Sequence, residues 1–431
     1  MKIHFIGVGG IGVSALAQYY LSKGHKVSGS DLASSEITEF LQDKGIKITI
    51  GNYAKNIKSG IDLIIYSPAV RQNNPEMLKA ESCGLKTISY PEALGQLTKE
   101  YFTIAVSGTH GKSTTTSMLA LVLIKAGLDP TVILGTKLKE FGNTNFRAGK
   151  SKILVIEADE YSSSFLNYWP DLIILTNIEK EHLDYFKNLK NILKIYKEYV
   201  NHLRKGGILV ANREDKNICK ITKESKQTTL FYSIKQKEAK KLKNILKIPG
   251  KHNIYNALAV LSTARILKIS DKISFDVFSK YKGSWRRFDL KRGVIGRRKI
   301  TIISDYGHHP TEVLATLTAA RERYPKKKIW CVFQPHQHQR THYLFADFVK
   351  TFRVLPIDSI IITDIYDVAG RETKKNNAEV SSEKLVKIID KNNVNYLLLR
   401  DIEKYIKENI KSGDVLVIMG AGNIYKLCQK F

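Results

Sequence analysis

The sequence contains two glycine-rich stretches of the kind that binds phosphate groups. One of them, VSGTHGKSTTT, occupies residues 106–116. In such a loop backbone N–H groups surround the phosphates, and a lysine such as Lys112 reaches the β and γ oxygens. A hydroxyl of Ser113 or Thr114 would ligate Mg²⁺. The general pattern has a glycine where this chain has Val106, so we expect a variant loop that binds a nucleoside triphosphate.

The other stretch, FIGVGGIGVSALA at residues 5–17, matches a dinucleotide fingerprint between a strand and a helix. The glycines of the pattern are Gly7, Gly9, Gly10 and Gly12. They would let backbone N–H groups approach a pyrophosphate at a helix N-terminus. Asp31 ends the next expected strand, 19 residues after Gly12, where an acidic residue can take ribose hydroxyls. Because NAD and a UDP-sugar both carry a pyrophosphate, this loop alone does not identify its nucleotide.

Candidate metal ligands follow two further expected strands. Glu157 and Asp159 lie at the C-terminal end of KILVIEADEY, and His182 comes just after the strand in DLIILTNIEKEHLDYF. An α/β sheet places its ligands at the C-terminal ends of its strands. Carboxylates there suit Mg²⁺, which prefers hard oxygen donors and is often shared with substrate phosphates. We therefore expect a magnesium site near the second loop.

Two histidine-rich stretches in the last third of the chain each follow an apolar strand. They read DYGHHP at 305–310 and FQPHQHQRTH at 333–342. Zinc is disfavoured, because the stretches lack thiolates and the HExxH pattern, and because Arg340 would repel a cation. Arg340 instead offers a fork for a carboxylate, and imidazoles bind phosphate or position an amine. Upstream, Arg286 and Arg287 would stabilise charge that develops on a transferred phosphoryl group.

Alternating apolar and amphipathic segments must position these residues, and they predict parallel α/β units throughout. The expected strands and helices are 2–8, 12–23, 25–31, 36–44, 62–70, 101–108, 152–159, 171–178, 207–212, 250–267, 299–305, 327–336, 359–367 and 414–422. A charged segment at 213–247 is expected to be a surface excursion. Breaks near residues 99 and 290 divide the chain into three expected α/β domains, 1–99, 100–290 and 291–431.

Bulk properties restrict the classes of function. The chain has 431 residues and a formal net charge of +28, but its lysines are spread along the sequence without a clustered basic stripe or aromatic ladder. We therefore do not expect a nucleic-acid partner. No apolar run is long enough to span a membrane, and the start of the chain reads as a strand rather than a signal peptide. Four cysteines without a CxxC pair favour a reducing compartment, and we expect a cytoplasmic protein.

Taken together and in order, the motifs resemble those of the Mur ligase family. They are GVGGIGVSALA, YSPAV, SGTHGKSTTT, EADEYSSSFL, TNIEKEHLDYF, GKHNIYNA, RRFD, DYGHHPTE, FQPHQHQRT, DIYDVAGRE and MGAGNI. The resemblance implies an N-terminal Rossmann-like UDP-binding domain, a central P-loop-type ATPase domain with a parallel sheet, and a C-terminal Rossmann-like domain. It also implies a ligase that uses ATP and Mg²⁺ to join L-alanine to the carboxylate of UDP-N-acetylmuramate through an acyl phosphate. The first loop would then hold the UDP part and the second loop ATP.

The resemblance also implies roles for individual residues. The ATP positions are Gly108, Thr109, His110, Gly111, Lys112, Ser113, Thr114, Asn253, Asn256, Arg287 and Asp305. The UDP-sugar positions are Gly7, Gly9, Gly10, Gly12, Asp31 and Ser67. The metal positions are Ser113, Glu157 and His182, and those near the amino acid and the transferred phosphoryl group are His308, His336 and Arg340. The catalytic set is Lys112, Glu157, His182, His308 and Arg340, with His308 as base or positioner of the amine.

Two departures from the family pattern and several alternatives stay open. The middle region around 213–247 is short for an alanine-adding member. Related ligases carry a carbamylated lysine where this chain has Tyr196, 14 residues past His182. A family member that adds an intact peptide to the same UDP-sugar is one alternative, and an NAD-dependent oxidoreductase built on the first loop is another. The sequence leaves open a monomer or a homodimer, and the strictness for L-alanine over glycine or serine.

Overall fold

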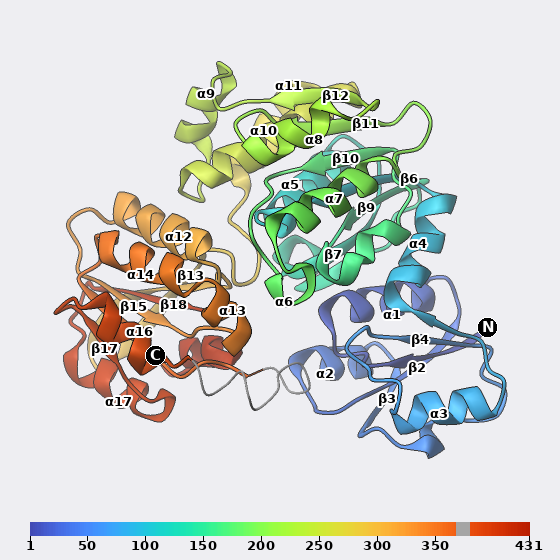
Figure 1. Ribbon diagram of the computed structural model, residues 1–431, viewed down its shortest axis with the longest axis horizontal. Helices are drawn as coiled ribbons and strands as arrows, with labels where there is room; N and C mark the ends of the chain where they lie inside the picture. Colours follow the sequence, from blue (N-terminus) through green and yellow to red (C-terminus); the bar gives the residue numbers. More distant parts are fainter. Residues whose placement is uncertain (368–379) are drawn as a thin grey trace. The chain divides into compact units, whose positions relative to one another are not determined.

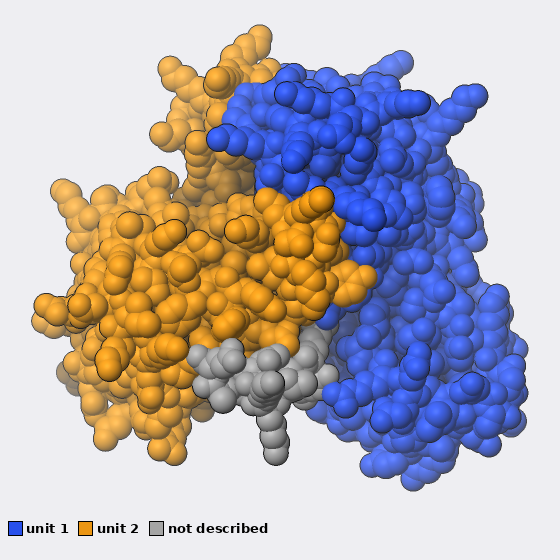
Figure 2. All heavy atoms as spheres, viewed as in Figure 1, with its two compact units in different colours: residues 1–178, 192–233, 258–277 blue, residues 179–191, 234–257, 278–431 orange. Residues whose placement is uncertain are grey.

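The computed structural model describes residues 1–367 and 380–431, and the chain divides into two compact units (Figure 1, Figure 2). The first unit comprises residues 1–178, 192–233 and 258–277, and the second comprises 179–191, 234–257 and 278–431. Two sheets lie in the first unit and one in the second (Figure 1). No helix within the described ranges is long and apolar enough to cross a membrane. The motif DIYDVAGRE continues past residue 367 and lies partly outside the described residues.

The N-terminal sheet has five parallel strands in the order β3-β2-β1-β4-β5. Its elements are β1 (Lys2–Ile6), α1 (Ile11–Ser22), β2 (Lys26–Asp31), α2 (Glu36–Asp43), β3 (Lys47–Ile50), β4 (Leu63–Tyr66), α3 (Pro75–Ser82), β5 (Thr87–Ser89) and α4 (Tyr90–Glu100). This is the strand order of a dinucleotide-binding fold, and the order reverses between β1 and β4. Ligands bind at such a switch point, beyond the C-terminal ends of the strands.

The central sheet has seven strands in the order β12-β11-β10-β6-β9-β7-β8. Its strands are β6 (Phe102–Ser107), β7 (Thr131–Leu138), β8 (Thr144–Arg147), β9 (Ile153–Glu157), β10 (Leu172–Leu175), β11 (Ile208–Asn212) and β12 (Thr228–Tyr232). The helices along residues 100–290 are α5 (Lys112–Lys125), α6 (Leu183–Phe186), α7 (Leu189–Val200), α8 (Lys216–Lys223), α9 (Glu238–Ile245), α10 (Lys251–Ile266) and α11 (Asp271–Lys280), of which α6 and α9 belong to the second unit. Strands such as LIIL in β10 are buried along their whole length, as expected for parallel strands covered on both faces.

The third sheet has six strands in the order β13-β14-β18-β15-β16-β17, with only the β13–β14 pair antiparallel. Its strands are β13 (Asp289–Ile295), β14 (Arg298–Asp305), β15 (Ile329–Phe333), β16 (Ser359–Ile362), β17 (Val394–Tyr396) and β18 (Val415–Met419). Its helices are α12 (Pro310–Arg323), α13 (His338–Tyr343), α14 (Phe345–Val354), α16 (Ser382–Ile389) and α17 (Leu399–Asn409). Successive strand residues face opposite sides, so Ile303 joins one hydrophobic core and Ile302 the other.

The predicted strands and helices are all present, and the three-domain α/β fold is confirmed. The domain boundaries near 99 and 290 stay predictions. The charged segment 213–247 is more regular than expected, because it holds α8, β12 and α9, and β12 pairs with β11. The antiparallel β7–β8 hairpin was not predicted either. It packs on α1 through Asn145, which donates to the Ile11 carbonyl and to Ser14 Oγ.

Candidate active site

The first glycine-rich loop lies at the switch point of the N-terminal sheet. Gly7 follows β1 with a φ of 76°, in the left-handed region that favours glycine. A Cβ on Gly7 would come within 2.9 Å of the Ser67 Cβ, just past the end of β4. The two predicted UDP-sugar positions, Gly7 and Ser67, therefore lie side by side where this type of sheet binds its ligand.

Asp31 supports the same loop. Its Oδ2 accepts a hydrogen bond from the Gly9 N–H at 2.8 Å. A Cβ on Gly9 would come within 2.9 Å of that oxygen, so a side chain there would push the carboxylate away. One carboxylate oxygen of Asp31 thus holds the first loop in place. The contact of Asp31 with ribose hydroxyls stays a prediction.

Gly12 reveals a contact that the sequence did not predict. It lies in the first turn of α1, and a Cβ on it would meet the ring and hydroxyl of Tyr90 at 2.7 Å. Burial and the charges of Glu157 and Asp159 raise the pKa of Tyr90 above its usual value. The Tyr90 phenol therefore lies between the first loop and the carboxylates beside the second loop.

The first glycine of the second loop, Gly108, comes two residues later than the first glycine of the general pattern. Val106 is a buried residue of β6, so the turn is made at Gly108, whose φ is 132°. A Cβ on Gly108 would collide with Thr176 Oγ1, which leaves glycine as the residue that fits. Asn177 holds the loop from the end of β10, because its Oδ1 accepts from the His110 N–H at 2.8 Å and its carbonyl from the Thr109 N–H at 2.9 Å.

Helix α5 starts directly after this loop. Gly111 precedes it with a φ of 82°, and no side chain caps the first turn. The first N–H groups of a helix have no partner within the helix, and they attract anions together with the helix dipole. Loop and helix therefore form a cradle that fits a triphosphate.

Ser113 and Glu157 meet at the edge of the cradle. Ser113 Oγ donates to Glu157 Oε2 at 2.9 Å, and the Gly135 N–H donates to Glu157 Oε1 at 2.6 Å. A hydroxyl and a carboxylate in contact are hard oxygen ligands that fit Mg²⁺ beside phosphates. The predicted ligand His182 belongs to the second unit, at the start of α6 with a φ of 52°. It stays a predicted ligand.

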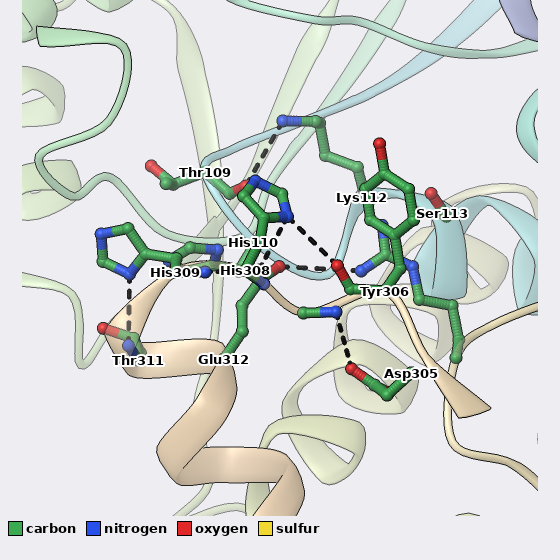
Figure 3. Close-up of polar contacts among 12 residues, drawn as sticks. Thr109, His110, Lys112, Ser113, Asp305, Tyr306, His308, His309, Thr311 and Glu312 are labelled. Carbon is green, nitrogen blue, oxygen red and sulfur yellow. Dashed lines mark hydrogen bonds and ion pairs between the residues drawn. The ribbon is translucent and has the colours of Figure 1, made fainter. Parts of the chain in front are cut away.

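Lys112 is anchored within the first unit (Figure 3). Its Nζ donates to the Gly108 carbonyl at 2.7 Å and to Glu160 Oε2 at 2.8 Å. Burial alone would lower the pKa of Lys112, but the Glu160 and Asp159 carboxylates raise it above its usual value. The lysine therefore carries its positive charge throughout the physiological pH range.

In the second unit, Arg340 in α13 is held by groups from two segments. Its Nε donates to Glu181 Oε1 at 2.7 Å, and its Nη1 lies 3.0 Å from His336 Nδ1. Both partners of the Arg340–Glu181 pair are buried, and Arg340 together with nearby histidines, including His182 and His309, holds the pKa of Glu181 well below its usual value despite burial. Arg340, His182 and Tyr343 line a small pocket.

His308 and His309 lie directly before α12 (Figure 3). His309 caps the helix by accepting from the Thr311 N–H, and its Nε2 lies 3.1 Å from the Lys180 carbonyl. His308 lies 5.7 Å from His336, measured between ring centroids, and 3.6 Å from Glu312. Burial and then Arg340 lower the pKa of His308 to about 3, so its imidazole is neutral.

The two adjacent arginines have different surroundings. Arg286 is buried among the rings of Trp285, Tyr306 and Tyr425, and it donates to the carbonyls of Gly420 and Gly422. It therefore anchors the MGAGNI loop and is not available to a phosphate. Arg287 lies 3.6 Å from Glu312 and is partly exposed. Of the two guanidinium groups, the one on Arg287 fits the phosphate role.

The other predicted ATP positions are buried and hydrogen-bonded. Asp305 accepts from the Phe288 N–H and the Gly307 N–H, both at 2.8 Å, and thus holds the turn before α12. Asn253 and Asn256 lie one turn apart on α10 and hydrogen-bond to each other at 3.3 Å. The contacts of these three residues with ribose and adenine stay predictions. Tyr196, at the place of the carbamylated lysine, is buried in α7 with its ring edge against Phe165.

Three models of the Mur ligase family match the chain in succession. They are described as the Mur ligase family catalytic domain over residues 2–102, the Mur ligase middle domain over 106–264, and the Mur ligase glutamate ligase domain over 286–422. The chain therefore belongs to the Mur ligase family.

Two curated relatives that are similar over their full length are both named UDP-N-acetylmuramate–L-alanine ligase. The UDP-N-acetylmuramate–L-alanine ligase of Caldanaerobacter subterraneus is 39% identical over 457 residues, covering 100% of this chain and 97% of the relative. That of Clostridium botulinum is 42% identical over 455 residues with the same coverage. The crystal structure of the UDP-N-acetylmuramate–alanine ligase from Thermotoga maritima superimposes with a TM-score of 0.82 at 27% identity, covering 100% of this chain and 98% of that one. A murein peptide ligase from Psychrobacter arcticus has a TM-score of 0.74 at 22% identity, which shows the shared fold.

Proposed function

We propose that this chain is an ATP-dependent ligase that joins L-alanine to the carboxylate of UDP-N-acetylmuramate, a step in the synthesis of peptidoglycan precursors. The observation that carries the proposal is the pair of phosphate-binding loops in the first unit. Among the described residues, the second loop alone has a lysine and a serine that each contact a carboxylate, Glu160 and Glu157 respectively. One loop thus suits the diphosphate of a substrate handle, and the other suits a reacting triphosphate. The names of the full-length relatives support the choice of substrates.

The reaction requires activation of a carboxylate, because its oxygen is a poor leaving group. A carboxylate oxygen attacks the γ-phosphorus of ATP and ADP leaves, which gives an acyl phosphate. The neutral amine of L-alanine then attacks the carbonyl carbon, and phosphate leaves with the former carboxylate oxygen. Catalysis therefore needs alignment of the three reactants and neutralisation of phosphate charge.

The residues of the first unit serve the first step. Lys112 and the N-terminus of α5 bind the phosphates, with Ser113 and Glu157 as ligands of Mg²⁺. When bound, Mg²⁺ neutralises charge on the β and γ oxygens. The glycines of the first loop and Ser67 bind the UDP part of the sugar, with Asp31 holding the loop.

The residues of the second unit serve the amino acid and the transferred phosphoryl group. Arg340 is fixed by Glu181 and His336 through Nε and Nη1. Its remaining guanidinium nitrogen, Nη2, donates no hydrogen bond to another described residue. That nitrogen suits the carboxylate of L-alanine. His308, whose neutral imidazole has a lowered pKa, is a weak base. We assign it the role of positioning the amine. We further propose a cytoplasmic location, with a monomer or homodimer as the assembly.

The test is release of phosphate from ATP by the purified protein with combinations of co-substrates. We expect full release only with UDP-N-acetylmuramate and L-alanine together, and slower release with glycine or serine. The preference over glycine is small, because one methyl group in a pocket contributes only about 1–3 kcal/mol. Full release with DNA alone, with an intact peptide instead of L-alanine, or with no co-substrate would reject the proposal.

Gly12→Val is expected to raise the apparent KM for the UDP-sugar by roughly tenfold or more, since a close-approach glycine tolerates no side chain. The valine would also collide with Tyr90. The matched variant is Ser113→Ala, which should weaken use of Mg·ATP and leave equilibrium binding of the UDP-sugar nearly unchanged. Calorimetric titration of both variants with each nucleotide distinguishes the loops. Loss of ATP binding with retained UDP-sugar binding in Gly12→Val would mean that the assignment of nucleotides to loops is reversed.

His308→Gln is expected to keep a kcat within about tenfold of the parental value. His308→Ala should lose roughly 10²-fold, the lower end of the range for removal of one preorganised polar contact. Glutamine replaces the hydrogen bonds of a neutral imidazole but is not a base. The measurement is kcat at saturating substrates from pH 6 to pH 9, where a histidine whose pKa is about 3 does not titrate. Two results together would identify His308 as the base. They are an equal loss of kcat in both variants, and an ionisation near pH 6–7 in the pH profile of the parent that is absent from the profiles of the variants.

A further inference from the structure

One buried carboxylate beside the second loop has no role in the mechanism above. Glu160 lies on the loop that follows β9, three positions after Glu157, and its side chain is only 3% exposed. Its Oε2 accepts from Lys112 Nζ at 2.8 Å. Its Oε1 is also buried and has no hydrogen-bond partner within the part of the chain that the structure describes.

Lys112 directs all its donors to the protein. An ammonium group has three N–H donors. Those of Lys112 point to the Gly108 carbonyl at 2.7 Å, the Thr109 carbonyl at 3.4 Å and Glu160 at 2.8 Å. A phosphate oxygen must therefore displace at least one of them. Glu160 is the one ionisable group among these three acceptors, and its carboxylate is the acceptor that most resembles a phosphate oxygen.

The surroundings of Glu160 strengthen this contact. Tyr196 lies nearby, and burial together with the charges of Glu160 and Asp159 raises its pKa well above the usual value. The Tyr196 ring packs on Phe165, which stacks on Tyr199 at 4.2 Å between centroids. Water screens little in such a place, and a carboxylate there depends on its partner for compensation. Burial of the Glu160 carboxylate next to Lys112 therefore costs desolvation free energy, which the contact with the lysine offsets.

We propose that Glu160 is a positioning residue that holds Lys112 in the nucleotide-free enzyme, where it occupies the place of a phosphate oxygen until ATP displaces it. The contact orients the lysine towards the cradle before ATP arrives, and it competes with ATP for the same ammonium group. The inference rests on the proposed function, because it takes the second loop as the ATP site. Its consequence is that removal of the Glu160 charge tightens ATP binding.

The experiment is calorimetric titration of Mg·ATP into the full-length parent and its variants. Glu160→Gln keeps the shape of the side chain and should lower the Kd for ATP roughly tenfold, the scale of one hydrogen bond to a charged group. The control Asp129→Asn removes an ion-paired carboxylate of the same unit whose partner is Arg147 instead of Lys112. It should change the Kd by less than about threefold, because surface pairs contribute little and this one does not contact the lysine.

Two further measurements separate positioning from a general effect of charge or folding. The gain from Glu160→Gln should disappear in a Lys112→Ala background, since the carboxylate acts through the lysine. In turnover assays, KM for ATP should fall in parallel with the Kd while KM for the UDP-sugar stays constant. If circular dichroism shows that Glu160→Gln does not fold, Glu160→Asp carries the test. Aspartate keeps the charge but is shorter, so its carboxylate lies further from Lys112 Nζ. We therefore expect a smaller gain in ATP affinity than for Glu160→Gln.

Unchanged or weaker ATP binding by a folded Glu160→Gln or Glu160→Asp variant would overturn the inference. So would an equal gain in the Lys112→Ala background. Failure of the parent protein to bind ATP would be a different result, because it would reject the proposed function itself.

Discussion

Lys112→Ala is expected to reduce kcat by roughly 10²-fold or more, the loss that follows removal of one preorganised contact to a developing charge. Lys112 is the cationic side chain anchored at the loop, next to the N-terminus of α5. The variant should fold, because the buried ionisable group that loses its partner, Glu160, can be neutralised. Burial already raises the pKa of Glu160 to about 7, so that carboxyl group takes up a proton and becomes neutral.

The measurement is the rate of ADP formation at saturating substrates, with circular dichroism and UDP-sugar titration as tests of the fold. Lys125→Ala, at the other end of α5, is a matched control that should leave the rate unchanged. If a folded Lys112→Ala protein formed ADP at nearly the parental rate, residues 108–113 would be a turn with no role in catalysis.

Arg340→Lys is expected to lower kcat/KM for L-alanine by roughly 10²-fold, because lysine cannot reproduce a planar fork with donors in fixed directions. Arg340 uses Nε for Glu181 and Nη1 for His336, which leaves Nη2 for the substrate. A lysine has a single nitrogen for all these tasks. Lysine at position 340 should leave the equilibrium binding of ATP and of the UDP-sugar nearly unchanged, since the phosphate-binding loops proposed for both lie in the first unit.

The control for this prediction is Arg353→Lys. Arg353, in α14, donates to the carbonyls of Ile388 and Ile389, so the variant tests a stabilising arginine of the same unit. It should change stability but not kcat/KM for L-alanine. If Arg340→Lys instead weakened the UDP-sugar and L-alanine equally, Arg340 would be a structural residue.

The sequence predicted the elements that carry the site because each has a strong local signal. Buried runs such as those of β10 and β15 indicate parallel strands, and the glycines at 7 and 108 indicate sharp turns before helices. The weaker elements were missed for physical reasons. β12 alternates between exposed and partly buried residues at the edge of its sheet, and its short apolar stretch resembles a surface loop.

The contacts that position the reactive groups were harder to predict. Glu160 and Glu181 read as ordinary acidic residues next to predicted ligands, and only the fold places them against Lys112 and Arg340. Tyr90 lies 78 positions after Gly12 in the sequence, yet its phenol packs on that glycine. Such pairs depend on tertiary packing between segments distant in sequence. A buried charge must have a partner, but the sequence alone does not identify which one.

The central claim is that the carboxylate of UDP-N-acetylmuramate is activated by phosphoryl transfer before L-alanine attacks. The measurement is turnover of UDP-N-acetylmuramate whose carboxylate carries ¹⁸O, followed by mass spectrometry of the released phosphate. An acyl phosphate predicts that each phosphate contains one oxygen from that carboxylate, and that the sugar product gains the mass of one alanine residue. Phosphate without the label would mean that water attacks ATP, and it would contradict the account.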